Sequence, residues 1–416
     1  MTLGWSLQPL LLRQIVRKRY SVLLPLPQLR GSPARLAPSL HLSAPRHRTA
    51  GVNMDLEAAA AAAACAPRAP ASGAQKRIDY TGLPKVELHV HMDGACRVDT
   101  LRKLSRQHQL DYPHDDEEEF KKRIMLLSPA TSLAQFLEVF GAIGDILCTK
   151  EAVERVAYEY CEELGRQNVV YFELRHNPMG KKMEPEQYVE GVMAGLERGE
   201  KDFGVKSRQI LIFIRGKPED ADKVLELALK YRPRGVVGVD IAGNELLPLD
   251  PIQTQALLAA RANGLHLTMH AGESGPPDNV RQAIEEFGAE RIGHGYRVLE
   301  DEAIYKLARE KNVHFEACLT SSIFTNSQKE LESHAVKRWA LDGTSFSLST
   351  DDPGVIGNDL LTEYRAASQE VGLTKEQLVK SVLDGVAAAF LPGNEKEQLL
   401  RKVKAGIAEW EKSILF

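Results

Sequence analysis

The sequence predicts an α/β fold in which eight parallel strands and their helices close into a (β/α)8, or TIM, barrel. Two observations carry this prediction. Eight short runs rich in β-branched residues end in Gly, Pro, Asn or Asp, and longer segments with helical spacing separate them. A doubly wound open sheet is the alternative, but it calls for a glycine-rich phosphate-binding turn, and the chain has none.

The predicted strands are short and evenly distributed, spanning residues 85–91, 169–175, 209–214, 235–241, 266–270, 291–294, 313–317 and 345–350. Helices are expected over 150–167, 219–231 and 300–311, where apolar residues recur on one face. A helical insert over 98–147 is too long for a simple crossover, so part of it should cover the mouth of the barrel. Two extra helices should follow the last strand, one starting at a capping box at Thr374 and one over 395–414.

Composition narrows the classes of function. The chain has 416 residues, of which 43% are hydrophobic and 26% charged, and its formal net charge is -4. This balance implies no strong attraction to nucleic acid or to an anionic membrane, and no apolar stretch is long enough to span a bilayer. The five cysteines form no Cys-x-x-Cys pair, which is typical of reduced thiols in a cytoplasmic protein.

The N-terminal segment differs from the rest of the chain. Residues 1–53 contain several Arg but no Asp or Glu, a composition that suits a mitochondrial transit peptide. A disordered extension, or translated sequence upstream of a start at Met54, explains it equally simply, and we favour this interpretation. We therefore expect a disordered extension over 1–75 and a single barrel domain over 76–416.

Polar residues capable of chemistry stand at the ends of the predicted strands. In the first strand, His89 and His91 are two positions apart and share the inward face. Two buried imidazoles on one face are costly unless something binds them, and a metal ion is the usual partner. A hydrogen-bonded pair of core histidines is the alternative.

Three further predicted strands also end in polar residues that are capable of chemistry. His270 is followed after two small residues by Glu273, so a nitrogen donor and a proton-carrying carboxyl lie at one edge. His294 stands between two glycines, where the backbone can turn sharply. Asp351 and Asp352 project to different sides, so one can ligate a metal while the other meets a substrate. An ordinary loop-starting turn is the alternative for this pair.

A barrel brings all of its strand ends to one rim, where active sites of this fold lie. His89, His91, His270 and Asp351 together form a nitrogen-rich set completed by one oxygen ligand, which suits Zn²⁺. His294 and Glu273 then remain to handle protons.

In this combination the sequence resembles the adenosine deaminase family of amidohydrolase-type barrels, from about residue 83 to 391. The resemblance implies that one zinc ion, held by the four ligands named above, activates a water that attacks C6 of adenosine or 2′-deoxyadenosine. Glu273 would protonate purine N1, His294 would orient or deprotonate the water, and inosine or deoxyinosine and ammonia would form. The matching motifs are His89-Val-His91-Met-Asp93-Gly94, His270-Ala-Gly-Glu273, His294-Gly and Ser347-Leu-Ser-Thr-Asp351-Asp352-Pro353.

The resemblance also implies the substrate contacts. Asp352 would bond purine N7, Gly243 purine N3 through its backbone N–H, and Asp93 the ribose 5′-hydroxyl, while His91 lies beside the substrate. An apolar lid would come from the insert, although a plain core stripe has the same spacing; its residues are Leu133, Phe136, Leu137 and Phe140. Ser349 departs from the family pattern, where Asn is common, but no ligand is missing.

Three other functions compete. A deaminase of AMP or N6-methyl-AMP would need Arg or Lys near Asp93, whereas a carboxylate there argues for a neutral hydroxyl. A two-metal amidohydrolase usually needs a bridging Lys on the fourth strand, and residues 235–243 contain none. An inactive barrel could serve as a binding or signalling module, but intact Glu273 and Asp351 argue against it. The expected partner is a small purine nucleoside; the sequence indicates no nucleic acid and no particular protein partner.

Overall fold

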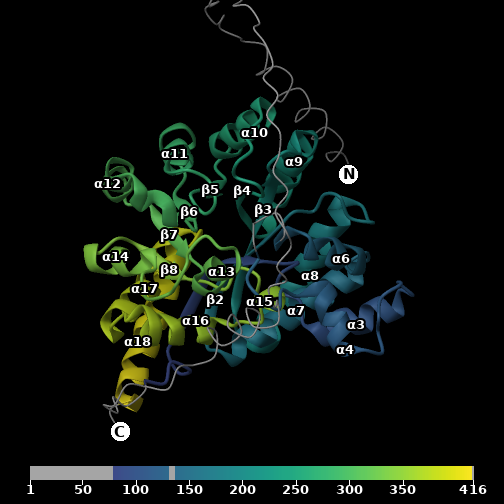
Figure 1. Ribbon diagram of the computed structural model, residues 1–416, viewed down its shortest axis with the longest axis horizontal. Coiled ribbons are helices and arrows are strands. Elements are labelled where there is room, and N and C mark those ends of the chain that lie inside the picture. The colour runs from purple at the N-terminus through teal and green to yellow at the C-terminus, as the bar shows by residue number, and fades with distance from the viewer. Residues whose placement is uncertain (1–77, 131–135, 415–416) are drawn as a thin grey trace, which may run out of the picture. The chain divides into compact units, whose positions relative to one another are not determined.

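The computed structural model describes residues 78–130 and 136–414. Its strands form one parallel sheet in which each strand pairs with the next along the chain (Figure 1). The strands are β1 (Lys85–His91), β2 (Val169–His176), β3 (Lys206–Ile214), β4 (Val236–Ala242), β5 (His266–His270), β6 (Arg291–Gly293), β7 (His314–Ala317) and β8 (Phe346–Leu348).

The sheet curves until its first and last strands meet. Val90 and Asp351 form a parallel bridge, in which the His91 amide donates to the Asp351 carbonyl at 2.9 Å and the Asp351 amide to the His89 carbonyl at 3.1 Å. Eight parallel strands in a nearly closed barrel confirm the predicted fold class. The predicted strand bounds agree with the structure to within three residues at each end.

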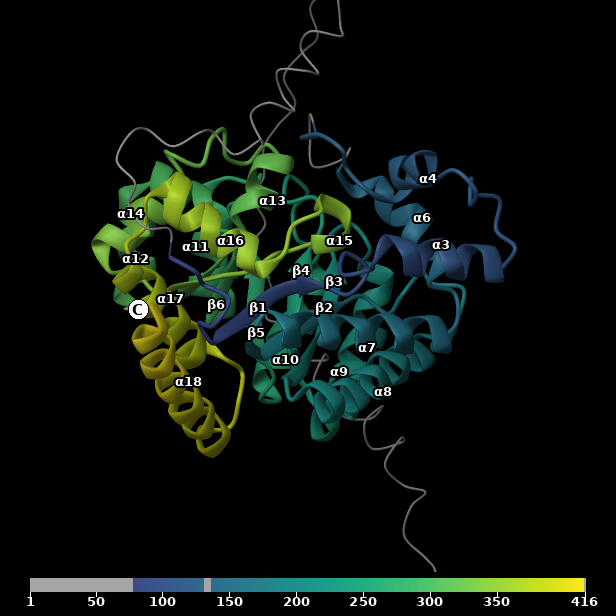
Figure 2. The same cartoon turned by 90° about the horizontal axis from the view of Figure 1, so that it is seen from below.

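Helices alternate with the strands and pack around them (Figures 1 and 2). In α7 (Lys150–Arg166), the predicted apolar stripe is the buried face, and Thr149 caps the N-terminus by accepting from the Ala152 amide. The other helices between strands are α8 (Pro185–Phe203), α9 (Ala221–Tyr231), α10 (Pro251–Ala262), α11 (Pro277–Gln282), α12 (Glu302–Glu310), α13 (Leu319–Phe324) and α14 (Ala335–Asp342).

The insert between β1 and β2 contains α3 (Val98–Gln107), α4 (Glu117–Ile124) and α6 (Val139–Ile146), which lie beside one another in both views. After β8 the structure differs from the prediction of two helices. In the described residues four α-helices and one π-helical turn, η5 (Ala367–Val371), follow, because Pro353 and the N-cap Asp359 each start a short additional helix. The four are α15 (Pro353–Ile356), α16 (Leu360–Ala366), α17 (Lys375–Ala388) and α18 (Gly393–Ile414). The capping box at Thr374 is present as predicted.

Side-chain alternation in the strands separates two kinds of interior. On β1, Val86, Leu88 and Val90 are fully buried in the apolar core, whereas Lys85, Glu87 and His89 are equally buried among polar partners. The interior of the barrel is therefore a charged and hydrogen-bonded core. The apolar core lies between the outer face of the strands and the helices.

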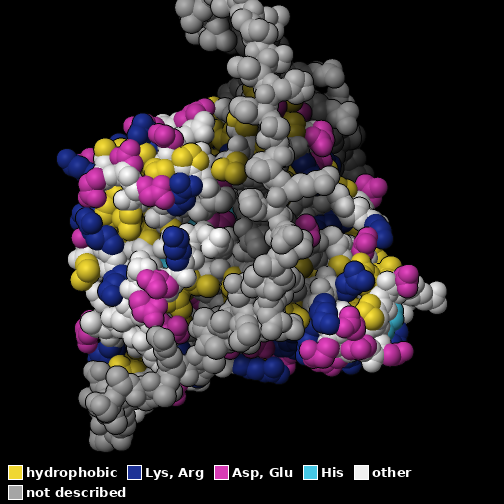
Figure 3. Space-filling model, in the orientation of Figure 1, with side chains coloured by type: hydrophobic (Ala, Val, Ile, Leu, Met, Phe, Trp, Pro, Cys, Tyr) yellow, Lys and Arg dark blue, Asp and Glu magenta, His cyan; other side chains and the backbone are white. Residues whose placement is uncertain are grey.

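The described surface mixes both signs of charge. Figure 3 shows acidic and basic side chains interspersed over α3 and α4, where Arg102, Lys121 and Lys122 pair with Glu117, Glu118 and Glu119. Within the described residues, no helix is both long and apolar enough to cross a membrane. The expectations for residues 1–75 concern a segment outside the described part of the chain.

Candidate active site and metal centre

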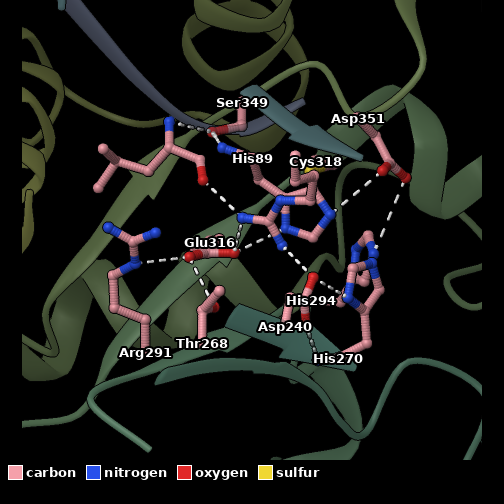
Figure 4. Close-up of polar contacts among 12 residues, drawn as sticks. His89, Asp240, Thr268, His270, Arg291, His294, Glu316, Cys318, Ser349 and Asp351 are labelled. Atoms are coloured by element: carbon pink, nitrogen blue, oxygen red, sulfur yellow. Dashed lines mark hydrogen bonds and ion pairs between the residues drawn. The ribbon is translucent and has the colours of Figure 1, made fainter. Parts of the chain in front are cut away.

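The carboxyl ends of four strands bring together side chains that are up to 262 positions apart. His89, His270, His294 and Asp351 are all buried, and each offers a ligand atom within 4.8 Å of the others. Figure 4 shows the three rings and the carboxylate gathered at the strand ends. This is the convergence that the barrel was expected to produce.

His91, the other predicted ligand, lies at the edge of this group. Its Nε2 atom is 3.2 Å from Asp351 Oδ1, and its ring centroid is 5.3 Å from those of His89 and His270. Five candidate ligands therefore surround one point. The four residues whose ligand atoms lie closest together include His294 and not His91. The sequence had assigned His294 to proton handling.

Buried carboxylates orient two of the histidines. His89 Nδ1 lies 2.7 Å from Glu316 Oε2, and His270 Nδ1 lies 2.9 Å from Asp240 Oδ2. An ionised carboxylate only accepts hydrogen bonds, so Nδ1 of His89 carries the proton and Nε2 keeps its lone pair; the charge of Asp240 beside His270 Nδ1 favours the same form of that ring. This is the form of imidazole that binds metals.

The arrangement is unfavourable without a cation. His89 Nε2 is buried, has no hydrogen-bond partner among the described residues, and lies 3.2 Å from Asp351 Oδ1. Two electron-rich atoms this close repel one another unless a positive charge lies between them. The donor set therefore fits a metal ion, and the site suggests one.

A buried arginine joins the two orienting carboxylates. Arg175 Nη1 lies 2.8 Å from Asp240 Oδ2 and Nη2 lies 2.7 Å from Glu316 Oε2, all fully buried. Arg291 reaches the other oxygen of Glu316 at 2.7 Å. Although burial alone would raise it, Arg175 and then Arg291 hold the pKa of Glu316 well below its usual value. Both carboxylates thus remain anionic acceptors.

Glycines allow the close approach of His294. His294 and Gly295 have φ values of 63° and 76°, and a Cβ at Gly293 would lie 2.8 Å from His89 Cε1. His294 Nδ1 contacts the Tyr296 hydroxyl at 3.2 Å, and that hydroxyl donates to the Cys318 carbonyl. The proton therefore lies on Nδ1, which leaves a basic Nε2 facing Asp351 at 3.8 Å and Glu273 at 3.9 Å.

Glu273 is held as a neutral acid. Its side chain is buried, and desolvation, followed by the charge of Asp351, raises its pKa to about 8. Glu245 fixes the loop by accepting hydrogen bonds from the amides of Gly272 at 2.7 Å, Glu273 at 2.9 Å and Ser274 at 3.3 Å. A protonated carboxyl is therefore available beside the metal centre at neutral pH.

Two predicted substrate contacts have matching local structure. Asp352 is buried, its Oδ1 has no hydrogen-bond partner among the described residues, and desolvation followed by Asp351 raises its pKa well above normal. A raised pKa favours the protonated carboxyl, which can donate a hydrogen bond. A Cβ at Gly94 would lie 1.8 Å from that oxygen, so the turn needs glycine. Gly243 follows β4 at a φ of 99°.

The predicted lid stripe divides in the structure. Phe136 is 3% exposed and packs against Phe140, with ring centroids 5.7 Å apart, whereas Leu137 is 39% exposed. Leu133 lies outside the described residues. Phe136 therefore belongs to the core, and Leu137 is the member that faces outward.

Sequence reasoning missed several residues of the site. Two of these residues could have been found from the sequence, because Asp240 in β4 and Glu316 in β7 are acidic residues at inward positions of their strands. No pattern in the sequence marked Lys181, which lies in the loop between β2 and α8. Its Nζ atom is 3.4 Å from Asp93 Oδ2. A basic group therefore lies beside Asp93. This is the feature that a deaminase of AMP or N6-methyl-AMP was expected to need. The missed residues are Arg175, Lys181, Asp240, Glu245 and Glu316.

A parallel barrel that gathers His and Asp side chains at its carboxyl-end rim is typical of metal-dependent hydrolases of the amidohydrolase type. A family model described as Adenosine deaminase matches residues 84–406. The chain belongs to the adenosine deaminase family.

Curated relatives and solved structures agree with this membership. The chain is 38% identical over 336 residues to an adenosine deaminase of Bos taurus, covering 76% of this chain and 92% of the relative. It is 36% identical to an adenosine deaminase of Shigella flexneri, covering 78% and 99%. A crystal structure of an Arabidopsis N6-mAMP deaminase superposes with a TM-score of 0.71 at 30% identity, covering 78% of this chain and 99% of that one.

Proposed function

We propose that the protein catalyses the zinc-dependent hydrolytic deamination of adenosine and 2′-deoxyadenosine to inosine or deoxyinosine and ammonia. The observation that carries the proposal is the convergence of lone-pair histidines on a buried carboxylate beside a protonated glutamic acid. Family membership supports adenosine as the substrate.

His89, His91, His270 and Asp351 would hold the zinc ion, because three nitrogens and one oxygen match its preferred ligands. When bound, the ion would lower the pKa of water enough to supply a nucleophile at neutral pH. His294 Nε2 carries a lone pair and faces Asp351, so it is placed to orient that water or to take its proton.

The remaining residues act on the purine and the ribose. Glu273 would give its proton to purine N1, which makes C6 electrophilic and leaves the Glu273 carboxylate as an anion. The protonated Asp352 would donate to N7, and the Gly243 amide to N3. Asp93 would accept the ribose 5′-hydroxyl. The buried walls exclude bulk water and so favour these proton transfers.

Adenosine consumption, followed by the ultraviolet change on conversion to inosine, tests the proposal. The parent protein should be active, and Glu273→Gln should reduce kcat by about 10²–10⁴-fold, since it removes the proton donor while keeping the shape. Glu370→Gln, the same change at an exposed position on η5 (Ala367–Val371), is the control. Full activity of Glu273→Gln would contradict the assigned donor, and no conversion by the parent would contradict the function.

A nucleoside 5′-monophosphate is the second candidate substrate. Lys181 beside Asp93 provides a cation near the expected 5′ position, and the Arabidopsis N6-mAMP deaminase is 30% identical in sequence. The Asp93 carboxylate would nevertheless repel a phosphate dianion, so adenosine should be preferred. Comparing kcat/KM for adenosine, AMP and N6-methyl-AMP decides between them.

A cytoplasmic location is part of the proposal. The four cysteines in the described residues are free, as a reducing compartment implies.

A further inference from the structure

The Lys181–Asp93 pair joins two loops that follow neighbouring strands. Asp93 lies two residues beyond β1, and Lys181 lies between β2 and α8. The two side chains are only 22% and 12% exposed, and the Nζ–Oδ2 distance is 3.4 Å. An ion pair this well shielded is screened by salt far less than a surface pair.

The loop that carries Lys181 is held in place at its start. At its start, Asn177 donates to the Ile212 carbonyl at 2.7 Å and accepts from the Met179 amide at 2.8 Å. The Lys181 ammonium also lies over the Tyr188 ring, 5.5 Å from its centroid. Its position is therefore set by contacts outside the pair.

The pair matters for Asp93 because it fixes the direction in which the carboxylate points. Lys181 approaches Oδ2 and leaves Oδ1 to accept a hydrogen bond. An acceptor oxygen held in one orientation binds a hydroxyl more selectively than one that is free to rotate.

We propose that Lys181 sets the specificity of this site for the 5′-hydroxyl of the nucleoside, by fixing the orientation of the Asp93 carboxylate. The inference rests on the proposed function, in which Asp93 accepts that hydroxyl. Lys181 is a positioning residue, since it acts through Asp93. Lys182, its neighbour in sequence, contacts the insert helix α6 and has no part in the effect.

Kinetics with adenosine and 5′-deoxyadenosine test the proposal, because the second substrate lacks only the 5′-hydroxyl. In the parent, adenosine should have the higher kcat/KM. Lys181→Met should lower kcat/KM for adenosine about tenfold, mainly through KM, and change that for 5′-deoxyadenosine less than about twofold. Lys182→Met is the matched control and should leave the ratio of the two substrates unchanged. Equal losses on both substrates with Lys181→Met would overturn the proposal.

A double-mutant cycle separates action through Asp93 from a general effect on folding. In an Asp93→Asn background, Lys181→Met should cause no further change in the substrate ratio, whereas a second tenfold loss would overturn the proposal. Lys181→Arg keeps the charge and should retain the parental ratio within about threefold. If Lys181→Met does not fold, a parental ratio in Lys181→Ala overturns the proposal, and a tenfold lower ratio supports it.

The failure of this proposal is distinguishable from failure of the proposed function. A parent that converts both nucleosides, with a substrate ratio insensitive to Lys181, contradicts only the role of Lys181. A parent that converts neither nucleoside contradicts the function itself.

Discussion

The two sides of the candidate site are built differently. The metal side stands on strand ends, and its orienting residues Arg175, Asp240 and Glu316 are fully buried, with polar contacts of 2.7 to 2.9 Å. The ribose side stands on loops, where Lys181 and Asp93 are partly exposed and 3.4 Å apart. The difference indicates that the strands fix the geometry of the chemistry, whereas the loops adjust which substrate is accepted.

The largest effect should come from the strand-built side. Arg175→Lys replaces a fork that binds two carboxylates with a single ammonium, so His89 or His270 loses its fixed orientation. We expect zinc affinity to fall by about 10–100-fold, measured by competition with a chromogenic chelator. Lys182→Met, a matched change on the loop side, should leave zinc affinity unaltered. Unchanged affinity in Arg175→Lys would show that the network does not set the metal geometry.

A smaller effect should appear in the pH dependence. Glu273 must be protonated to act as an acid, and burial raises its pKa to about 8. A raised carboxyl pKa keeps the active form present at neutral pH and loses it as the pH rises through that value. We therefore expect kcat/KM for adenosine to fall about tenfold per unit above pH 8. A decline that begins near pH 5 instead would mean that Glu273 is an ordinary ionised carboxylate.

The contrast between the two sides also explains what the sequence could predict. The barrel and the convergence of His89, His270 and Asp351 followed from local signals, namely strand alternation and the residues that end each strand. These signals survive folding because parallel strands in a barrel must share one rim. The sequence also showed His294 between two glycines. The structure explains Gly293, because a Cβ at this position would lie 2.8 Å from His89 Cε1.

Other parts of the site depend on contacts that sequence patterns do not encode. Glu316 reaches His89 across the barrel, which depends on the register of β7 relative to β1. Lys181 reaches Asp93 because of the conformation of one loop, and no periodicity describes that loop. The spacing of the predicted lid residues, Leu133, Phe136, Leu137 and Phe140, indicated one apolar face. Packing instead buries Phe136 and leaves Leu137 exposed.

The metal content of the protein tests the central claim most directly. Protein stripped of metal with a chelator should not convert adenosine, and titration with Zn²⁺ should restore activity in proportion until one ion is bound per chain. Full deamination of adenosine by metal-free protein, or an end point at two ions per chain, would contradict a single cation at the meeting point of His89, His270 and Asp351.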